Sequence, residues 1–298
     1  MAGKIALLLG LAALALSPPA VAQPNAIPDL SGPWGRDVLY LELPPLGAGP
    51  VVNRMKRPNG SMNGSALVGD DSNPILKPAA AEALKRVGAI SLTGAAFANP
   101  HNQCRPEPVP FTLAIQFGVQ IVQTRGEVLL LYLGDHKVRH VPMDVPHPSP
   151  VNPTWQGDSV GHYEGDALVI DTVGVKTGPL AMVDQYGTPY SEALHVVERY
   201  RLIDGKAARD AQAAQMKMHP EVIPYPYGRG PIDPDPARKG MQIEITVEDP
   251  GSFTMPWSAL VTYRHVLGDW PEAVCAENFH EYYADRDTDI PRARRPDF

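Results

Sequence analysis

His162 and Glu164 are the residues of this sequence best suited to chemistry. They lie in residues 157–172, where glycine-spaced polar residues and a Glu-Gly-Asp turn precede a β-branched run, a pattern that predicts a β-hairpin. Side chains alternate across a strand, so His162 and Glu164 project to one face and Tyr163 to the other. If that face lines a cavity, His162 can carry a proton near neutral pH, while Glu164 orients it or acts as the base.

A second pair, His195 and Arg199, shares a face on a neighbouring predicted strand. If both pairs line one cavity, Arg199 can hold a carboxylate or an enolate-like charge as it forms. The four residues are therefore the candidate catalytic group for proton transfer. In the alternative interpretation, Glu198 and Arg199 belong to an ion-pair network and His162 is an ordinary surface histidine.

Substrate contacts are expected from a proline-rich link and from aromatic residues. Asp144 and His147 lie in the link, where flanking prolines restrict the backbone and could hold the histidine over a barrel mouth, or simply form a rigid loop. With them, Tyr163 and Trp257 are the candidate substrate-binding residues. Aromatic side chains either line a pocket for a hydrophobic molecule or pack in the core. The residues concerned are Trp34, Phe111, Tyr163, Tyr200, Trp257 and Tyr263.

Metal and nucleophile chemistry have weaker support. His147, His162, Glu164 and His195 could supply the three or four ligands that a divalent metal needs, yet their spacing matches no local metal motif, so no cofactor is predicted. Ser159 sits in a Gly-x-Ser-x-Gly pattern. The residues after it are strand-like rather than helical, so it is not expected to be a nucleophile.

The chain has 298 residues, of which 44% are hydrophobic, enough for a sizeable core. Residues 1–22 carry Lys4, an apolar run of about a dozen residues and Ala20-Val21-Ala22, which predicts a secretory signal peptide rather than a retained anchor or a membrane span. Loss of Lys4 changes the formal charge from −7 to −8, which disfavours nucleic acid as a partner. We therefore expect a periplasmic or secreted protein.

The two cysteines, Cys104 and Cys275, both follow the signal. In an oxidising compartment they are expected to form a disulfide bond, and the alternative is two buried free thiols.

Short β-rich runs joined by tight turns dominate the rest of the sequence. They cover residues 119–124, 127–133, 137–143, 157–172, 193–203, 241–247 and 253–266. With almost no helices between them, these runs predict an all-β fold, an antiparallel lipocalin-like barrel or half-barrel, as one domain over residues 23–298.

Two segments are expected to lie outside the strands of this barrel. The N-terminal loop-and-helix region includes a helix expected to begin at Pro78 and to stop at Gly88. The insertion, residues 206–239, has an alanine-rich, helix-prone start and a segment crowded with proline and tyrosine, and it is either a lid or a mobile surface loop.

The sequence resembles a large family of exported bacterial proteins that mostly lack an assigned activity. The resemblance covers most of the mature chain. It rests on Asp29-Leu30-Ser31-Gly32-x-Trp34, Cys104-Arg105-Pro106, Gln116, Gly157-x-Ser159-x-Gly161-His162-x-Glu164-Gly165-Asp166-x-Leu168, Asp171-Thr172, Ser191-x-x-Leu194-His195-x-x-Glu198-Arg199, Asp249-Pro250, Pro256-Trp257 and the tail from Cys275 to Phe298.

The resemblance implies a lipocalin-like β-barrel with long decorations and no general catalytic assignment. This chain differs in having Tyr163 where tryptophan is usual, Ala167 where threonine is usual, and a longer segment over residues 206–239. Two functions are consistent with these observations. One is a lyase or isomerase that acts by proton transfer on a small hydrophobic or aromatic molecule, and the other is a non-catalytic carrier of such a molecule.

Overall fold

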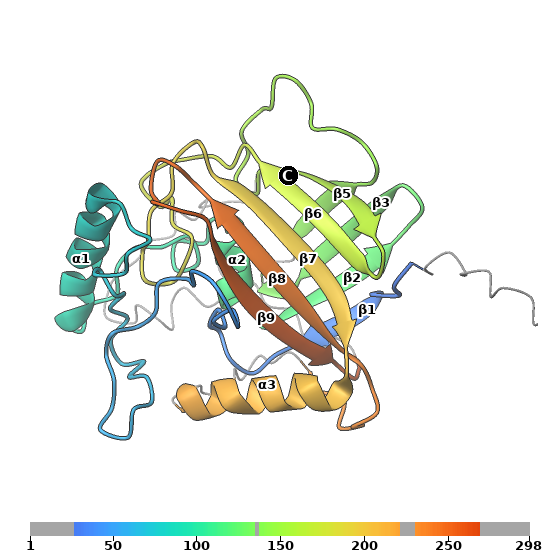
Figure 1. Ribbon diagram of the computed structural model, residues 1–298, viewed down its shortest axis with the longest axis horizontal. Coiled ribbons are helices and arrows are strands. Elements are labelled where there is room, and N and C mark those ends of the chain that lie inside the picture. Colours follow the sequence, from blue (N-terminus) through green and yellow to red (C-terminus); the bar gives the residue numbers. More distant parts are fainter. Residues whose placement is uncertain (1–26, 135–136, 221–229, 269–298) are drawn as a thin grey trace, which may run out of the picture.

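The computed structural model describes residues 27–134, 137–220 and 230–268, and its centre is a nine-stranded antiparallel sheet curled into a nearly closed barrel (Figure 1). The spatial order of the strands is β4-β3-β2-β1-β9-β8-β7-β6-β5. Their bounds are β1 (Gly32–Gly35), β2 (Gly118–Gln123), β3 (Glu127–Tyr132), β4 (Val138–Pro142), β5 (Asp158–Glu164), β6 (Ala167–Val173), β7 (His195–Ile203), β8 (Gly240–Glu248) and β9 (Trp257–His265). The expected all-β antiparallel barrel is therefore confirmed.

The two edge strands, β4 and β5, meet at a short seam. Met143, just after β4, forms a parallel bridge with Gly161 of β5, and the backbone N–H of Asp144 donates to the Gly161 carbonyl at 2.7 Å. A Cβ on Gly161 would lie 2.8 Å from the Met143 sulfur and 2.9 Å from Val141 Cγ1. Only glycine therefore lets the edges approach this closely.

Residue alternation decides what fills the barrel. In β8 the side chains of Ile243, Ile245 and Val247 are fully buried, while their neighbours point outward. Large aromatic side chains occupy the same core, so most of the aromatic residues that could have lined a ligand pocket are packing residues instead. These are Trp34, Tyr200, Trp257 and Tyr263.

A buried ion pair crosses the barrel interior. Arg139 of β4 donates from Nη2 to Glu198 Oε2 of β7 at 2.5 Å, and the two side chains are 2% and 0% exposed. Arg139 also donates to Ser159 Oγ at 3.0 Å and to Thr172 Oγ1 at 2.6 Å, and the Tyr200 hydroxyl donates to Glu198 at 2.8 Å. Burial lowers the pKa of Arg139, but the Glu198 carboxylate outweighs this and raises it overall, so the guanidinium stays charged.

Each predicted strand coincides with an observed strand to within a few residues. The strand bounds could be predicted because the turns between them are recognisable in the sequence. Glu164 pairs with Ala167 across a two-residue turn in which Gly165 has φ of +61°, a conformation that favours glycine. The Arg125-Gly126 turn likewise joins β2 to β3. Turn chemistry and the β-branched runs therefore suffice to predict this sheet.

Three helices are described, α1 (Pro78–Leu92), α2 (Phe111–Ile115) and α3 (Gly205–Met218). The expected stop of α1 at Gly88 is wrong, since the helix continues to Leu92. Gly88 is a buried position inside α1, where a Cβ would lie 2.9 Å from Val68 Cγ1, so glycine serves close packing rather than termination. Among the described residues, no helix has the length and apolar character of a membrane span.

Helix α3 forms the first part of the 206–239 insertion and lies along the barrel beside β8 and β9 (Figure 1). The Asp204 side chain caps its N-terminus by accepting from the backbone N–H groups of Lys206 and Ala207 at 2.9 and 3.1 Å. The buried Gln212 donates to the carbonyls of Gly35 and Thr262, both at 3.2 Å, so this helix is fixed to β1 and β9.

Residues 1–22 and Cys275 lie outside the described residues, as do Tyr225, Tyr227 and the chain tail. The signal peptide and the Cys104–Cys275 disulfide therefore stay predictions, and so does the division into a single domain.

The ion pair leads to a prediction about stability. Arg139→Met leaves the Glu198 charge buried and uncompensated, so we expect a loss of about 3–5 kcal/mol in the free energy of unfolding, measured by urea denaturation. The control is Arg199→Met, which removes the exposed ion pair of Arg199 with Glu164 and should lower the free energy of unfolding by about 1 kcal/mol or less.

The double variant Arg139→Met with Glu198→Leu removes both charges, so it should be more stable than Arg139→Met alone. Equal losses for Arg139→Met and Arg199→Met would contradict this role of the ion pair.

Candidate functional site

His162 and Glu164 lie on the outer wall of the barrel. Their side chains are 45% and 47% exposed, with His162 Nε2 at 2.9 Å from Glu164 Oε1. The expectation that this pair points into a barrel cavity is therefore wrong. The opposite face of β5 turns inward, with Ser159 buried against Arg139 and Gly161 buried at the seam.

Arg199 and His195 also project outward, from β7. Arg199 Nη1 donates to Glu164 Oε2 at 2.5 Å, and His195 Nε2 lies 2.9 Å from Asp171 Oδ2. Hydrogen bonds from Arg199 and from His162 lower the pKa of Glu164 to about 2, which makes this carboxylate a weak general base near neutral pH. Arg199 thus joins the surface contact of His162 and Glu164, while His195 belongs to a separate surface contact with Asp171, and the catalytic role of the four residues stays a prediction.

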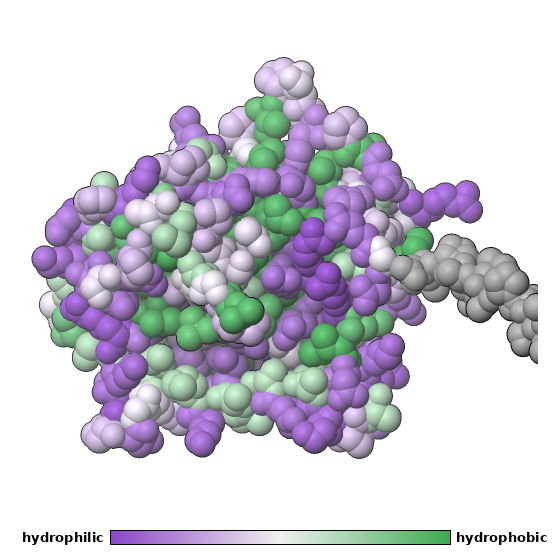
Figure 2. All heavy atoms as spheres, viewed as in Figure 1, coloured by the Kyte–Doolittle hydropathy of each residue, from purple (hydrophilic) through white to green (hydrophobic). Residues whose placement is uncertain are grey.

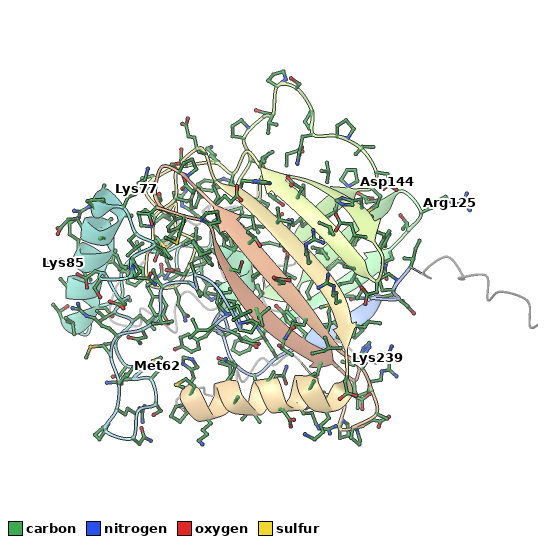
Figure 3. All side chains as sticks on the ribbon, viewed as in Figure 1. Met62, Lys77, Lys85, Arg125, Asp144 and Lys239 are labelled. Carbon is green, nitrogen blue, oxygen red and sulfur yellow. The ribbon has the colours of Figure 1, made fainter. Side chains whose placement is uncertain are left out.

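His147 bridges two strands on the same outer wall. Its Nδ1 lies 2.5 Å from Asp158 Oδ1 of β5, and its Nε2 lies 2.9 Å from Asp171 Oδ1 of β6. The histidine therefore fastens the proline-rich link to the barrel wall and does not hang over a barrel mouth. Asp144 is exposed at the start of this link, with φ of +56° (Figure 3).

The two remaining substrate-binding candidates, Tyr163 and Trp257, pack in or against the barrel core, and their substrate-binding role stays a prediction. The Tyr163 hydroxyl accepts from Gln123 Nε2 at 2.8 Å, and the ring packs against the core. Trp257 is 2% exposed and contacts Phe253 edge-on, with ring centroids 5.8 Å apart.

The four possible metal ligands do not converge. His147 and His195 share Asp171, whereas His162 contacts Glu164. Within the described ranges, no group of three or more histidine, cysteine, aspartate and glutamate side chains is arranged to hold a metal ion.

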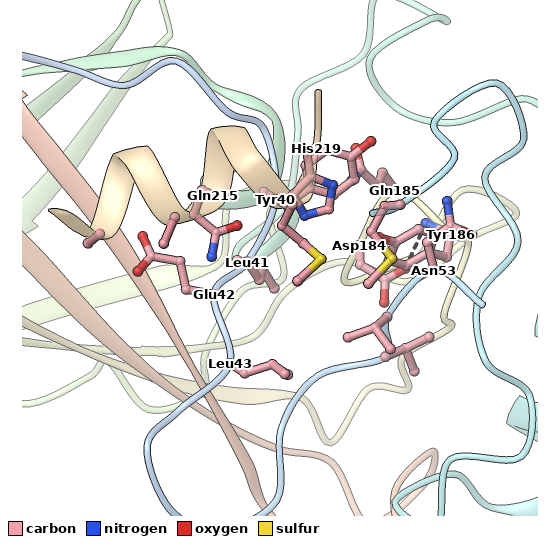
Figure 4. A pocket seen from close by; sticks show the side chains of 17 residues that line it. Tyr40, Leu41, Glu42, Leu43, Asn53, Asp184, Gln185, Tyr186, Gln215 and His219 are labelled. Carbon is pink, nitrogen blue, oxygen red and sulfur yellow. Dashed lines mark hydrogen bonds between the residues drawn. The ribbon is translucent and has the colours of Figure 1, made fainter. Parts of the chain in front are cut away.

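A cavity of about 310 Å³ lies outside the barrel, between α3, the N-terminal loops and residues 184–186 (Figure 4). Its size is at the lower end of the range for small-molecule sites. The wall is largely apolar with a few polar groups, which is the usual composition of such sites. It is lined by Tyr40, Leu41, Glu42, Leu43, Val51, Val52, Asn53, Met62, Ala114, Asp184, Gln185, Tyr186, Ala211, Ala214, Gln215, Met218 and His219.

Segments far apart in the sequence are tied together to form this cavity. The backbone of Glu42 pairs with Leu260 of β9 in both directions, at 2.8 and 2.9 Å. The buried Arg36 donates to the Tyr40 carbonyl at 3.2 Å, and the Met62 N–H donates to the Met218 carbonyl at 2.8 Å, next to the C-terminal end of α3 (Figure 3). Backbone hydrogen bonds and the buried Arg36 side chain therefore hold the cavity wall in place.

Asp184 is a buried carboxyl group of the cavity wall. It is 3% exposed, and burial raises its pKa to about 6, although hydrogen bonds from Thr188 and Tyr186 act in the opposite direction. Its Oδ1 accepts from the backbone N–H groups of Tyr186 and Thr188 at 2.9 and 3.1 Å. Its Oδ2 is buried and has no hydrogen-bond partner among the described residues. A carboxyl group with these properties is a frequent feature of functional sites.

Other ionisable groups border the same space. Burial raises the pKa of Glu42, whose oxygens accept from the Thr262 N–H at 2.8 Å and from its hydroxyl at 3.2 Å. The His219 ring stacks on Tyr40, with centroids 3.6 Å apart and an angle of 11° between the planes. Burial also raises the pKa of Tyr186, so its hydroxyl stays neutral.

Sequence reasoning missed this cavity. Its residues come from irregular segments and from one helix face, and no periodic pattern connects them. In the sequence, Asp184 is followed three positions later by Gly187, whose φ is +84°. This spacing indicates an ordinary Asx turn and gives no sign of a cavity.

Comparisons with protein-family models, curated proteins and solved structures find no match for this chain.

The contacts of His147 predict a pH dependence of stability. Partial burial lowers the pKa of His147, but hydrogen bonds with Asp158 and Asp171 and their negative charges outweigh this and raise it overall above 6.5. A raised histidine pKa contributes stability that is fully present below pH 6.5 and is lost as the pH rises through the folded-state value.

Urea denaturation from pH 5.5 to 9 should therefore show that wild-type stability falls with rising pH more than the stability of His147→Gln. His140→Gln is the control, because His140 is more exposed and contacts one carboxylate, that of Glu127. Parallel pH curves for the wild type and His147→Gln would rule out this contribution.

Proposed function

We propose that this protein binds a small hydrophobic or aromatic molecule in the cavity beside α3 and is an exported carrier of that molecule. The observation that carries the proposal is the cavity itself, an apolar space of about 310 Å³ with a buried carboxyl group in its wall. Apolar residues run along the side of α3 that faces the strands (Figure 2). Leu43 and Met218, which are exposed, line the cavity.

We favour a binding function over a catalytic one because His162 and Glu164, the expected proton-transfer pair, lie on the outer wall. The barrel interior also contains large buried aromatic side chains and the Arg139–Glu198 pair, which leaves the outer cavity as the better ligand site. A carrier of this kind needs shape and a few polar contacts, both of which the cavity provides.

An enzyme acting by proton transfer is the second candidate, and it rests on Asp184. A carboxyl group with pKa of about 6 can exchange a proton near neutral pH, which suits a lyase or an isomerase. In that case the chemistry takes place at Asp184 in the cavity.

We further propose that the chain belongs to the family of exported bacterial proteins that it resembles. The support is that its motif residues have structural roles in the barrel. Trp34 Nε1 donates to the Leu30 carbonyl at 2.8 Å, and the Ser191 N–H donates to Asp249 Oδ2 at 2.6 Å. Export of the chain to the periplasm or beyond is part of the same proposal and rests on residues 1–22.

Ligand binding is tested by placing a large side chain on α3 so that it fills part of the cavity. Ala214 lines the cavity on α3, and Ala213 is exposed on the same helix but does not line it. The purified protein is incubated with a panel of small aromatic compounds, and bound compounds are identified by native mass spectrometry. We expect Ala214→Phe to lower the affinity for a bound compound at least tenfold, about 1.4 kcal/mol, and Ala213→Phe to leave it unchanged.

Equal binding by both variants would place the site elsewhere. Long incubation then separates the two candidate functions. A carrier returns the compound unchanged, whereas an enzyme converts it and loses roughly a hundredfold or more of that activity in Asp184→Asn.

A further inference from the structure

The loop before α1 contains the tripeptide Asn-Gly-Ser twice, at residues 59–61 and 63–65. An asparagine followed by glycine can react with its own backbone, because glycine has no side chain to hinder attack of its peptide nitrogen on the asparagine amide carbon. Since the two tripeptides are identical, their local sequence gives them similar reactivity. A difference between them in the folded protein must therefore come from the structure around them.

At the second site, the amide carbonyl that would be attacked is held by two donors. Asn63 Oδ1 accepts from the Ser65 hydroxyl at 2.6 Å and from the Ser65 backbone N–H at 3.2 Å. Attack on Cγ places negative charge on this oxygen, and donors already aimed at it stabilise that charge. The first site has the same contacts from Ser61 to Asn59 Oδ1, at 2.7 and 3.1 Å. The amide carbonyl is therefore activated at both sites.

The attacking nitrogen distinguishes the two sites. It attacks as the amide anion, whose charge is shared with the carbonyl oxygen of the same peptide unit. At the second site this oxygen, that of Asn63, accepts from Asn53 Nδ2 at 3.2 Å, which favours the anion. None of the hydrogen bonds among the described residues has the Gly64 N–H as its donor. At the first site the Gly60 N–H donates to the Arg57 carbonyl at 2.9 Å, which favours the protonated form instead.

We propose that Asn63 is a site of spontaneous modification, at which the Gly64 nitrogen attacks Asn63 Cγ and the side chain loses ammonia. The new N–C bond closes a succinimide ring as the C–N bond of the side-chain amide breaks, and the proton of the Gly64 N–H leaves with the ammonia. Water then opens the ring at either carbonyl and leaves aspartate or isoaspartate. Asn63 and Gly64 are both partly exposed, so water can reach the ring.

The position of Asn63 gives the modification a local effect on the cavity wall. Met62, directly before it, lines the cavity and donates from its N–H to the Met218 carbonyl at 2.8 Å. Isoaspartate lengthens the backbone at position 63 by a carbon atom, and either product adds a negative charge there. The modification therefore alters the loop that joins the cavity wall to α3, and it does so whether or not the cavity binds a ligand.

Ageing of the purified protein tests this inference. The protein is kept at pH 8 and 37 °C, in buffer and in guanidinium chloride, and tandem mass spectrometry of its peptides follows the conversion of each asparagine to an acid. In buffer, we expect Asn63 to convert about threefold faster than Asn59 or more, the factor expected for one peptide hydrogen bond. In guanidinium chloride the two should convert at similar rates. Asn73 is the negative control, because Pro74 has no N–H with which to attack.

A single variant tests the role of the hydroxyl donor. Ser65→Ala removes the hydroxyl from Asn63 Oδ1, so it should slow the conversion of Asn63 severalfold and leave that of Asn59 unchanged. Equal rates at Asn63 and Asn59 in buffer, or a faster rate at Asn59, would overturn the inference. The same preference for Asn63 in guanidinium chloride would also overturn it, because the cause would then be the sequence rather than the fold. An unchanged rate at Asn63 in Ser65→Ala would count against it as well.

Discussion

A buried ion pair between Arg139 and Glu198 crosses the interior of the barrel. An isolated charge in this core would be costly, so each partner requires the other, together with the hydroxyls of Ser159, Thr172 and Tyr200. Arg139 lies on the edge strand β4 and Ser159 on the opposite edge strand β5, so the hydrogen bond between them joins the two ends of the sheet. The hydrogen bonds that pair these buried polar groups therefore also help to hold the sheet closed.

This arrangement explains which parts of the fold can be predicted from the sequence. The strands and most turns are predictable, since β-branched runs, Gly165 and Arg125-Gly126 are local signals. The orientation of β5 is not predictable. Both of its faces carry polar residues, so period-two alternation places His162 and Glu164 together without showing which face they share. The interior proves to hold an arginine, a glutamate and a serine, which is contrary to the usual preference for apolar residues inside.

The cavity was beyond sequence reasoning for a different reason. Its wall combines residues near positions 40, 52, 184 and 215, which are brought together by contacts such as Glu42 with Leu260 and Met62 with Met218. Local sequence patterns do not predict contacts between residues so far apart in the chain. In contrast, the outer-wall histidines were recognised from the sequence because their spacing on a strand is local, yet they contact carboxylates on the barrel surface. Local spacing thus identified polar residues that fasten the barrel, whereas the perturbed carboxyl group of Asp184 emerged only from the packing of loops on α3.

The seam between β4 and β5 also bears on how the protein behaves at high concentration. An open sheet edge exposes rows of unpaired N–H and C=O groups that can recruit strands from other chains and lead to aggregation. Here Met143 and Asp144 engage Gly161, and Pro142 at the end of β4 has no N–H to offer. The link that follows contains further prolines and is fastened to the wall by His147. The closure that builds the barrel thereby guards its two vulnerable edges against intermolecular β-pairing.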